Sequence, residues 1–165
     1  MKSSAIYITP IPTNHANSYW LGEPDANGQV PERHTSDGKG IPCRHCLENV
    51  TAGESYLVLS YRPFTEMQPY AECGPIFLHA EPCPAYQDVA NIPEMFLSGA
   101  PRIMKAYDKS NRIIYGSGKV VEPGDIITYA RELLSEAKVA YIHVRSSENN
   151  CFTFRIDREN SDDKE

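Results

Sequence analysis

The stretch CRHCLENVTAGESYLVLSYRPFTEMQPYAECGPIFLHAEPC, residues 43–83, contains the features that decide the fold. It begins with a C-x2-C pair, Cys43 and Cys46, and ends with an H-x3-C pair, His79 and Cys83. Three thiolates and one imidazole suit tetrahedral zinc, because this borderline-soft ion prefers sulfur and nitrogen donors. A closed set of four ligands leaves no reactive position. The four residues therefore predict a structural zinc site.

Two predicted strands connect the pairs. Residues 55–61, SYLVLSY, are apolar on both alternating faces, which is typical of a central strand covered on each side. Residues 75–80, PIFLHA, form the second strand, and His79 lies near its end. Both pairs of ligands could therefore meet at one end of a small sheet.

Other interpretations of these residues stay open. His79 could point into the core and leave His45, inside the first pair, as the substitute ligand. The thiols could also be free and buried around a core histidine. A C-x2-C pair serves thiol exchange as well, but that use normally places the first thiol at a helix N-terminus, and here GIP at 40–42 precedes it.

Composition limits the class of protein. The chain has 165 residues, 41% of them hydrophobic and 23% charged, as expected for one soluble globular domain. Its net charge of −6 argues against a nonspecific nucleic-acid binder. No run approaches the roughly 20 apolar residues that cross a bilayer, and the start MKSSAI lacks the apolar core of a signal peptide. We expect a cytoplasmic protein without nucleic-acid or membrane partners.

The number of cysteines and the absence of known motifs limit the kinds of chemistry that the sequence supports. Five cysteines are an odd number in a chain without an export signal, which favours metal binding or free thiols over a disulfide framework. The sequence has no P-loop, no dinucleotide-binding glycine motif and no G-x-S-x-G elbow, so no nucleotide cofactor is indicated.

The element order, strands, one helix, then strands, predicts a single α+β domain over residues 1–158 with a mainly antiparallel sheet. Residues 14–42 are dense in turn formers, which predicts a long irregular loop that covers the domain. The one clear helix spans about 125–137, where apolar residues recur at three- and four-residue steps. Residues 159–165 are charged and predict a frayed tail.

Strands at 139–145 and 151–157 predict a hairpin with one apolar and one polar face. Alternation assigns Ala140, Ile142, Val144, Phe152, Phe154 and Ile156 to the core, and Tyr141, His143, Arg145, Cys151, Thr153 and Arg155 to the polar face. Guanidinium groups bind carboxylates and phosphates in bidentate fashion, so this face could receive a small anion. The plain alternative is a solvated face with scattered ion pairs.

The connection between the first two central strands adds further polar residues. If it folds back over the polar face of the hairpin, a small pocket for an anionic ligand results, formed by Arg62, Tyr70, Glu72, His143 and Arg145. An ordinary salt bridge is the alternative. These observations favour a ligand-binding domain held together by zinc.

A Cys/His or zinc-dependent enzyme acting on a small anionic substrate is the alternative function. Cys46 or Cys151 could act as nucleophile, with His143 or His45 as base. An incomplete ligand set could instead leave zinc an open position for water. Whether the protein is an enzyme, and in which oligomeric state it exists, stays open at this point.

Seven short strings add a resemblance to a known family. They are PCRHCL at 42–47, LSYRPF at 59–64, PYAE at 69–72, GPIFLHA at 74–80, YGSG at 115–118, HVRS at 143–146 and NNC at 149–151. Together they resemble the bacterial family catalogued as domain of unknown function 1203, over about residues 40–158. The resemblance implies the extent of the domain, and it implies no activity, substrate or residue role.

Overall fold

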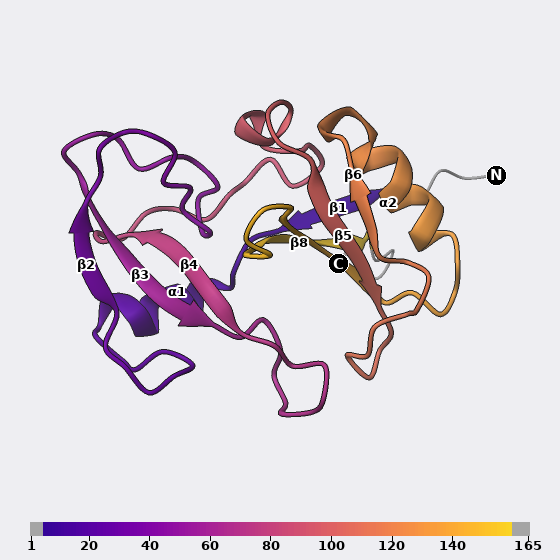
Figure 1. Ribbon diagram of the computed structural model, residues 1–165, viewed down its shortest axis with the longest axis horizontal. Helices are drawn as coiled ribbons and strands as arrows, with labels where there is room; N and C mark the ends of the chain where they lie inside the picture. Colours follow the sequence, from indigo (N-terminus) through magenta and orange to yellow (C-terminus); the bar gives the residue numbers. More distant parts are fainter. Residues whose placement is uncertain (1–4, 160–165) are drawn as a thin grey trace, which may run out of the picture.

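Two antiparallel sheets and two α-helices make up the computed structural model, which describes residues 5–159 (Figure 1). The expected α+β class is confirmed. In chain order the elements are β1 (Ile6–Thr9), α1 (Thr13–Trp20), β2 (Glu32–Thr35), β3 (Ser55–Tyr61), β4 (Gly74–His79), the 3-10 turn η1 (Glu94–Phe96), β5 (Arg102–Tyr107), β6 (Lys119–Val121), the 3-10 turn η2 (Pro123–Asp125), α2 (Ile126–Leu134), β7 (Tyr141–Ser146) and β8 (Phe152–Arg158).

The larger sheet has five strands in the order β1-β8-β7-β5-β6, and each neighbouring pair is antiparallel. Helix α2 lies over one face of this sheet (Figure 1). Its apolar stripe contributes Ile126, Ala130 and Leu133 to the core, as the helical period predicts. The strands supply fully buried partners on the facing side, among them Ile8, Met104, Ile142, Val144, Phe154 and Ile156.

Helix α2 ends at Leu134, three residues before the predicted end at about 137. The guanidinium of Arg158 donates hydrogen bonds to three carbonyl groups at and after the end of the helix, those of Leu134 (2.6 Å), Glu136 (3.3 Å) and Val139 (3.1 Å). A cation at a helix C-terminus satisfies carbonyls that have no partner within the helix and interacts favourably with the helix dipole. This contact from β8 fixes the turn that leads into β7.

The smaller sheet has the order β2-β3-β4, again antiparallel. Strands β3 and β4 confirm the two strands predicted between the ligand pairs. Alternate residues of β3, Leu57, Leu59 and Tyr61, are buried in a second core, which also contains Ala16 of α1. Phe152 of β8 belongs to this second core, so the two sheets share one packed boundary.

Two short elements occur in the segment 14–42, which was expected to be irregular throughout. Helix α1 has the sequence TNHANSYW, which is poor in strong helix formers, and its contacts with the smaller sheet outweigh that propensity. Strand β2 has four exposed residues and therefore no hydrophobic alternation. It forms because β3 offers an open edge, where Glu32 pairs with Val58.

The β7–β8 hairpin is largely buried on both faces, which excludes the alternative of a solvated polar face. Tyr141, His143, Arg145 and Thr153 are all less than 5% exposed. The connection after β3 packs Phe64 over this face, with its ring centroid 5.2 Å from that of His143. A register shift between Val144 and Arg145 also pairs Arg145 with Phe152. Phe152 therefore lies beside His143, although simple alternation assigned it to the opposite face.

The predicted charged tail, 159–165, lies outside the described residues apart from Glu159, whose amide donates to the carbonyl of Ala5 (2.9 Å). Within the described part of the chain, no helix has the length and apolar character needed to cross a membrane.

Candidate metal centre

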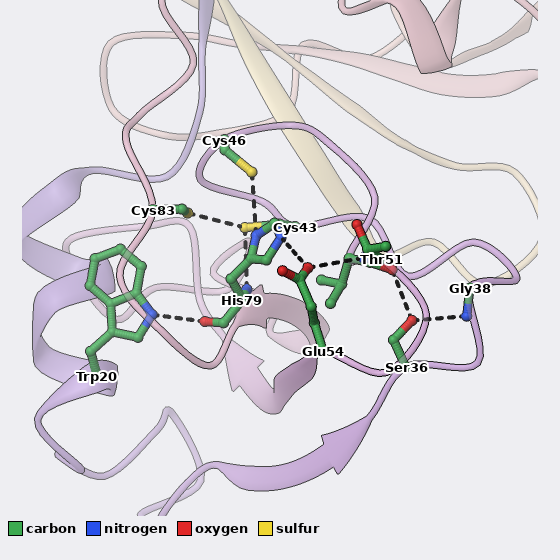
Figure 2. A network of polar contacts seen from close by, with 10 residues as sticks. Trp20, Ser36, Gly38, Cys43, Cys46, Thr51, Glu54, His79 and Cys83 are labelled. Atoms are coloured by element: carbon green, nitrogen blue, oxygen red, sulfur yellow. Dashed lines mark hydrogen bonds and ion pairs between the residues drawn. The ribbon is translucent and has the colours of Figure 1, made fainter.

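The structure brings Cys43, Cys46, His79 and Cys83 together at one end of the smaller sheet (Figure 2). No two of their ligand atoms are more than 4.8 Å apart. Cys43 and Cys46 are buried, and His79 and Cys83 are partly exposed. The convergence predicted from the two strands is therefore present, and the four side chains could hold a metal ion.

Backbone hydrogen bonds shape the first pair into a tight turn. The amide of Leu47 donates to the carbonyl of Cys43 (3.0 Å), and the amide of Cys43 donates to the carbonyl of Glu48 (2.9 Å). Leu47 has a φ of 58°, a left-handed conformation that reverses the chain directly after Cys46. The turn is attached to the sheet because the amide of Arg44 donates to the carbonyl of Phe77 in β4 (2.9 Å). Cys43 thereby lies beside the end of β4.

His79 is the last residue of β4 and faces the thiols. Its Nδ1 lies 3.4 Å from Cys46 Sγ, and its backbone amide donates to Cys43 Sγ (3.4 Å). The other ring nitrogen, Nε2, lies 3.9 Å from a carboxylate oxygen of Glu54 (Figure 2). A carboxylate behind the distal nitrogen orients a metal-binding imidazole and increases its basicity. Nδ1 is thus the nitrogen available to a metal.

His45 lies next to the four residues but outside the set of ligands. Its Nδ1 is 3.5 Å from Cys83 Sγ, and its Nε2 is 2.9 Å from the hydroxyl of Thr13 in α1. Trp20, at the other end of α1, packs edge-on against the His45 ring and donates its indole N–H to the carbonyl of His79 (2.8 Å). His45 therefore connects the sulfur cluster to α1, and His79 occupies the ligand position that His45 was expected to take if His79 faced the core.

Two separations between the four ligand atoms fit tetrahedral coordination by zinc. With Zn–S bonds of about 2.3 Å and a Zn–N bond of about 2.0 Å, the tetrahedral angle requires S···S separations of about 3.8 Å and S···N separations of about 3.5 Å. Cys43 Sγ and Cys83 Sγ are 3.8 Å apart, and Cys46 Sγ and His79 Nδ1 are 3.4 Å apart. Both the types of donor atom and these two separations are therefore those expected for zinc.

Hydrogen bonds among the thiols shift their pKa values in opposite directions. Hydrogen bonds from Cys46 and Cys83 lower the pKa of Cys43 below its usual range. The same contacts with Cys43 raise the pKa of Cys46 to about 12 and also raise that of Cys83. The hydrogen bond with Cys43 raises the pKa of His79. The protein alone thus favours one thiolate here, and a bound cation would be needed to hold three.

A second polar cluster lies on the buried face of the β7–β8 hairpin. Glu72 Oε1 accepts a hydrogen bond from Lys105 Nζ (3.0 Å) and lies 3.7 Å from Arg145 Nη2. Burial raises the pKa of Glu72, but the charges of Arg145 and Lys105 outweigh it and the pKa is lowered. Sequence reasoning missed Lys105, although it lies directly across from His143 in the β5–β7 register. The connection that carries Glu72 does fold back over this face.

The other residues expected in this pocket lie elsewhere. The Tyr70 hydroxyl lies 2.9 Å from that of Tyr115 at an exposed position. Arg62 lines a separate depression with Tyr19 and Tyr61. The structure thus brings together three of the five predicted residues, Glu72, His143 and Arg145.

His143 is 1% exposed and enclosed by aromatic rings. Its Nδ1 accepts a hydrogen bond from Arg145 Nη2 (3.2 Å), because a guanidinium only donates. Burial, reinforced by the charges of Arg145, Arg155 and Lys105, lowers the pKa of His143 well below its usual range. His143 is therefore a neutral imidazole with its proton on Nε2.

The candidate nucleophiles have no base among the proposed partners. Cys46 Sγ contacts His79, a residue of the metal cluster. Cys151 Sγ contacts the carbonyl of Asn149 (3.8 Å), and within residues 5–159 no hydrogen bond joins it to a histidine.

Fold and site together define an α+β domain with a Cys3His candidate metal centre. The chain belongs to the family described as protein of unknown function (DUF1203), whose sequence model matches residues 40–158. The match includes the four clustered residues and the β7–β8 hairpin. No curated protein and no solved structure matches the sequence.

Proposed function

We propose that the protein is a ligand-binding domain stabilised by a structural zinc ion at Cys43, Cys46, His79 and Cys83. The observation that carries the zinc assignment is the convergence of the four donors within 4.8 Å of one another, with the Cys43–Cys83 sulfurs 3.8 Å apart and Cys46 Sγ 3.4 Å from His79 Nδ1. Three sulfurs and one nitrogen favour zinc over magnesium or calcium, which prefer oxygen ligands. The carboxylate of Glu54 behind His79 supports the same assignment.

The proposed zinc ion has a structural role. Four protein ligands complete a tetrahedral shell, and Cys43 is fully buried, so a substrate has no position at the metal. The four residues come from a turn, a strand end and the loop after it. A zinc ion bound to all four residues would hold together these three segments, which share only a few backbone hydrogen bonds. None of the five cysteines forms a disulfide, which suits a reducing compartment, and the proposal includes a cytoplasmic location.

Metal analysis of the purified protein tests this proposal. We expect one equivalent of zinc, and a lower melting temperature after chelation. Cys43→Ser should lose the zinc, whereas Cys73→Ser, at an exposed cysteine outside the cluster, should retain it. A protein that is purified without metal and melts at the same temperature with and without chelator would contradict the assignment.

The ligand-binding part of the proposal is supported by the charges around His143. Lys105 and Arg145 contribute two positive charges against the single carboxylate of Glu72. The Nε atom of Arg145 is buried and has no hydrogen-bond partner among the described residues. The region around His143 therefore favours a ligand that brings a hydrogen-bond acceptor.

A further inference from the structure

A cavity of about 300 Å³ lies where the larger sheet meets α1 and the end of β3. Its walls are largely aromatic and proline side chains, and they include Tyr61, Phe64 and Phe152. The polar part of the wall includes His143, Arg155 and Asp157, with Thr9, His15, Thr65 and Asn111 around them. Ligand sites in proteins have this composition: an apolar lining and a few polar groups that orient the ligand.

His143 is the unusual member of this wall. Its Nδ1 is occupied by Arg145, so its Nε2 carries the proton and has to donate. Yet Nε2 is buried and has no hydrogen-bond partner in the described part of the chain. A buried donor without a partner is rare in native structures, because its desolvation is not compensated. The rings of Phe64 and Phe152 beside the imidazole carry no acceptor, and the nearby hydroxyl of Tyr107 is also buried without a hydrogen-bond partner among the described residues.

The charges near the cavity leave room for an acceptor. Arg155 and Asp157 neutralise each other, because Nε of the arginine donates to both carboxylate oxygens (2.8 and 3.0 Å). Thr9 donates to the same carboxylate (2.8 Å), so Asp157 is already satisfied. Behind His143, the Lys105, Arg145 and Glu72 cluster carries one excess positive charge. The local potential therefore favours an electron-rich atom next to the imidazole.

We propose that this cavity binds a small, largely apolar molecule whose acyl oxygen, in a carboxylate or an amide, accepts a hydrogen bond from His143 Nε2. This inference rests on the proposed ligand-binding function and names the site and the class of ligand. A dry cavity of roughly 150 Å³ accommodates benzene, so by proportion the space here suits about 12 non-hydrogen atoms. The ring or chain of the ligand lies against Phe64 and Phe152, and its oxygen lies next to His143.

Three small probes of similar shape test the proposal by NMR titration of the zinc-loaded, ¹⁵N-labelled full chain. Benzoate and benzamide have an acyl oxygen, and ethylbenzene has none. We expect benzoate or benzamide to shift the amide signals of Phe64 and Phe152 and the Nε2 signal of His143. Ethylbenzene should bind at least tenfold more weakly. Preference for benzoate identifies an anionic ligand, and equal binding of benzoate and benzamide identifies a neutral one; both support the proposed acyl contact.

Variants distinguish binding that depends on the hydrogen bond from His143 from binding that only fills the cavity. His143→Phe keeps an aromatic ring but removes the donor, and it should weaken benzoate and benzamide binding at least tenfold. His34→Phe makes the same change on the exposed strand β2 and should have no effect. Thr65→Trp, at an exposed position on the cavity wall, should block all three probes without affecting folding.

Two results would overturn the inference: no shifts with either acyl probe, or equal binding to the wild type and to His143→Phe. The zinc content of each sample is measured alongside. A sample that contains zinc but binds no probe contradicts the cavity assignment alone, and a sample without zinc contradicts the proposed metal centre instead.

Discussion

Replacing Glu54 by Gln tests the metal centre without removing a ligand. The Glu54 carboxylate lies 3.9 Å from His79 Nε2, the nitrogen on the far side of the imidazole from the thiols. Glu54 is 58% exposed, so its interaction with the imidazole is close to the aqueous limit. At this distance two unit charges in water interact by about 1 kcal/mol. We therefore expect Glu54→Gln to weaken zinc binding roughly five- to tenfold, the lower end of the range for outer-shell residues.

The assay is competition for zinc against a chromophoric chelator of known affinity. Glu48→Gln is the matched control. The hydrogen bond with Cys43 raises the pKa of His79 most, and both carboxylates raise it further, Glu54 more than Glu48. A smaller loss of affinity is thus expected for Glu48→Gln. Because an exposed charge is screened by salt, the Glu54→Gln effect should shrink as ionic strength rises. An unchanged affinity, or equal losses for both variants, would refute the assignment of Nδ1 as ligand and Glu54 as its support.

Three further predictions concern the rest of the molecule. Arg158→Met should destabilise the fold by about 1–2 kcal/mol in urea unfolding, because the carbonyls at the end of α2 lose a charged donor. The control Arg131→Met, at an exposed position, should leave stability nearly unchanged. Equal losses of stability in the two variants would contradict a stabilising role for the Arg158 hydrogen bonds. Ile142→Ala, in the main core, should cost about 2–5 kcal/mol, against less than about 0.5 kcal/mol for the exposed Val120→Ala. The pKa of Glu72 is lowered by folding, so its contribution to stability is present above the unfolded pKa and is lost as pH falls through the folded pKa. Glu72→Gln should therefore remove part of the loss of stability in acid, and a pH–stability curve identical to that of the wild type would exclude this contribution.

The metal cluster could be predicted because its determinants are local. The geometry of the cluster follows from a C-x2-C turn, two strands and a histidine at a strand end. The antiparallel register places His79 opposite Tyr56 at the end of the β3–β4 pair. Helix α2 could be predicted for the same reason, since its apolar period appears within nine residues. In both cases short-range pattern and tertiary packing agree.

The sequence predicted the grouping of Glu72 and Arg145 with His143 but not its burial, because the burial depends on contacts between distant segments. The register shift at Val144 and Arg145 leaves no clear sequence signal, and it moves Phe152 to the other face. Burial of that face depends on Phe64 from the connection after β3. The alternation of polar and apolar residues alone was therefore also compatible with a solvent-exposed polar face of this hairpin.

Helix α1 connects the two proposed sites and explains why they lie close together. Its sequence has little helical propensity, so its stability has to come from tertiary contacts. Thr13 and Trp20 attach its two ends to His45 and His79 beside the thiols. Between them, His15 lines the cavity and lies 3.0 Å from the Tyr61 hydroxyl. A metal ion that held His79 in place would therefore also hold the helix that closes one side of the cavity, so the proposed zinc ion would help to shape the proposed binding site without touching it.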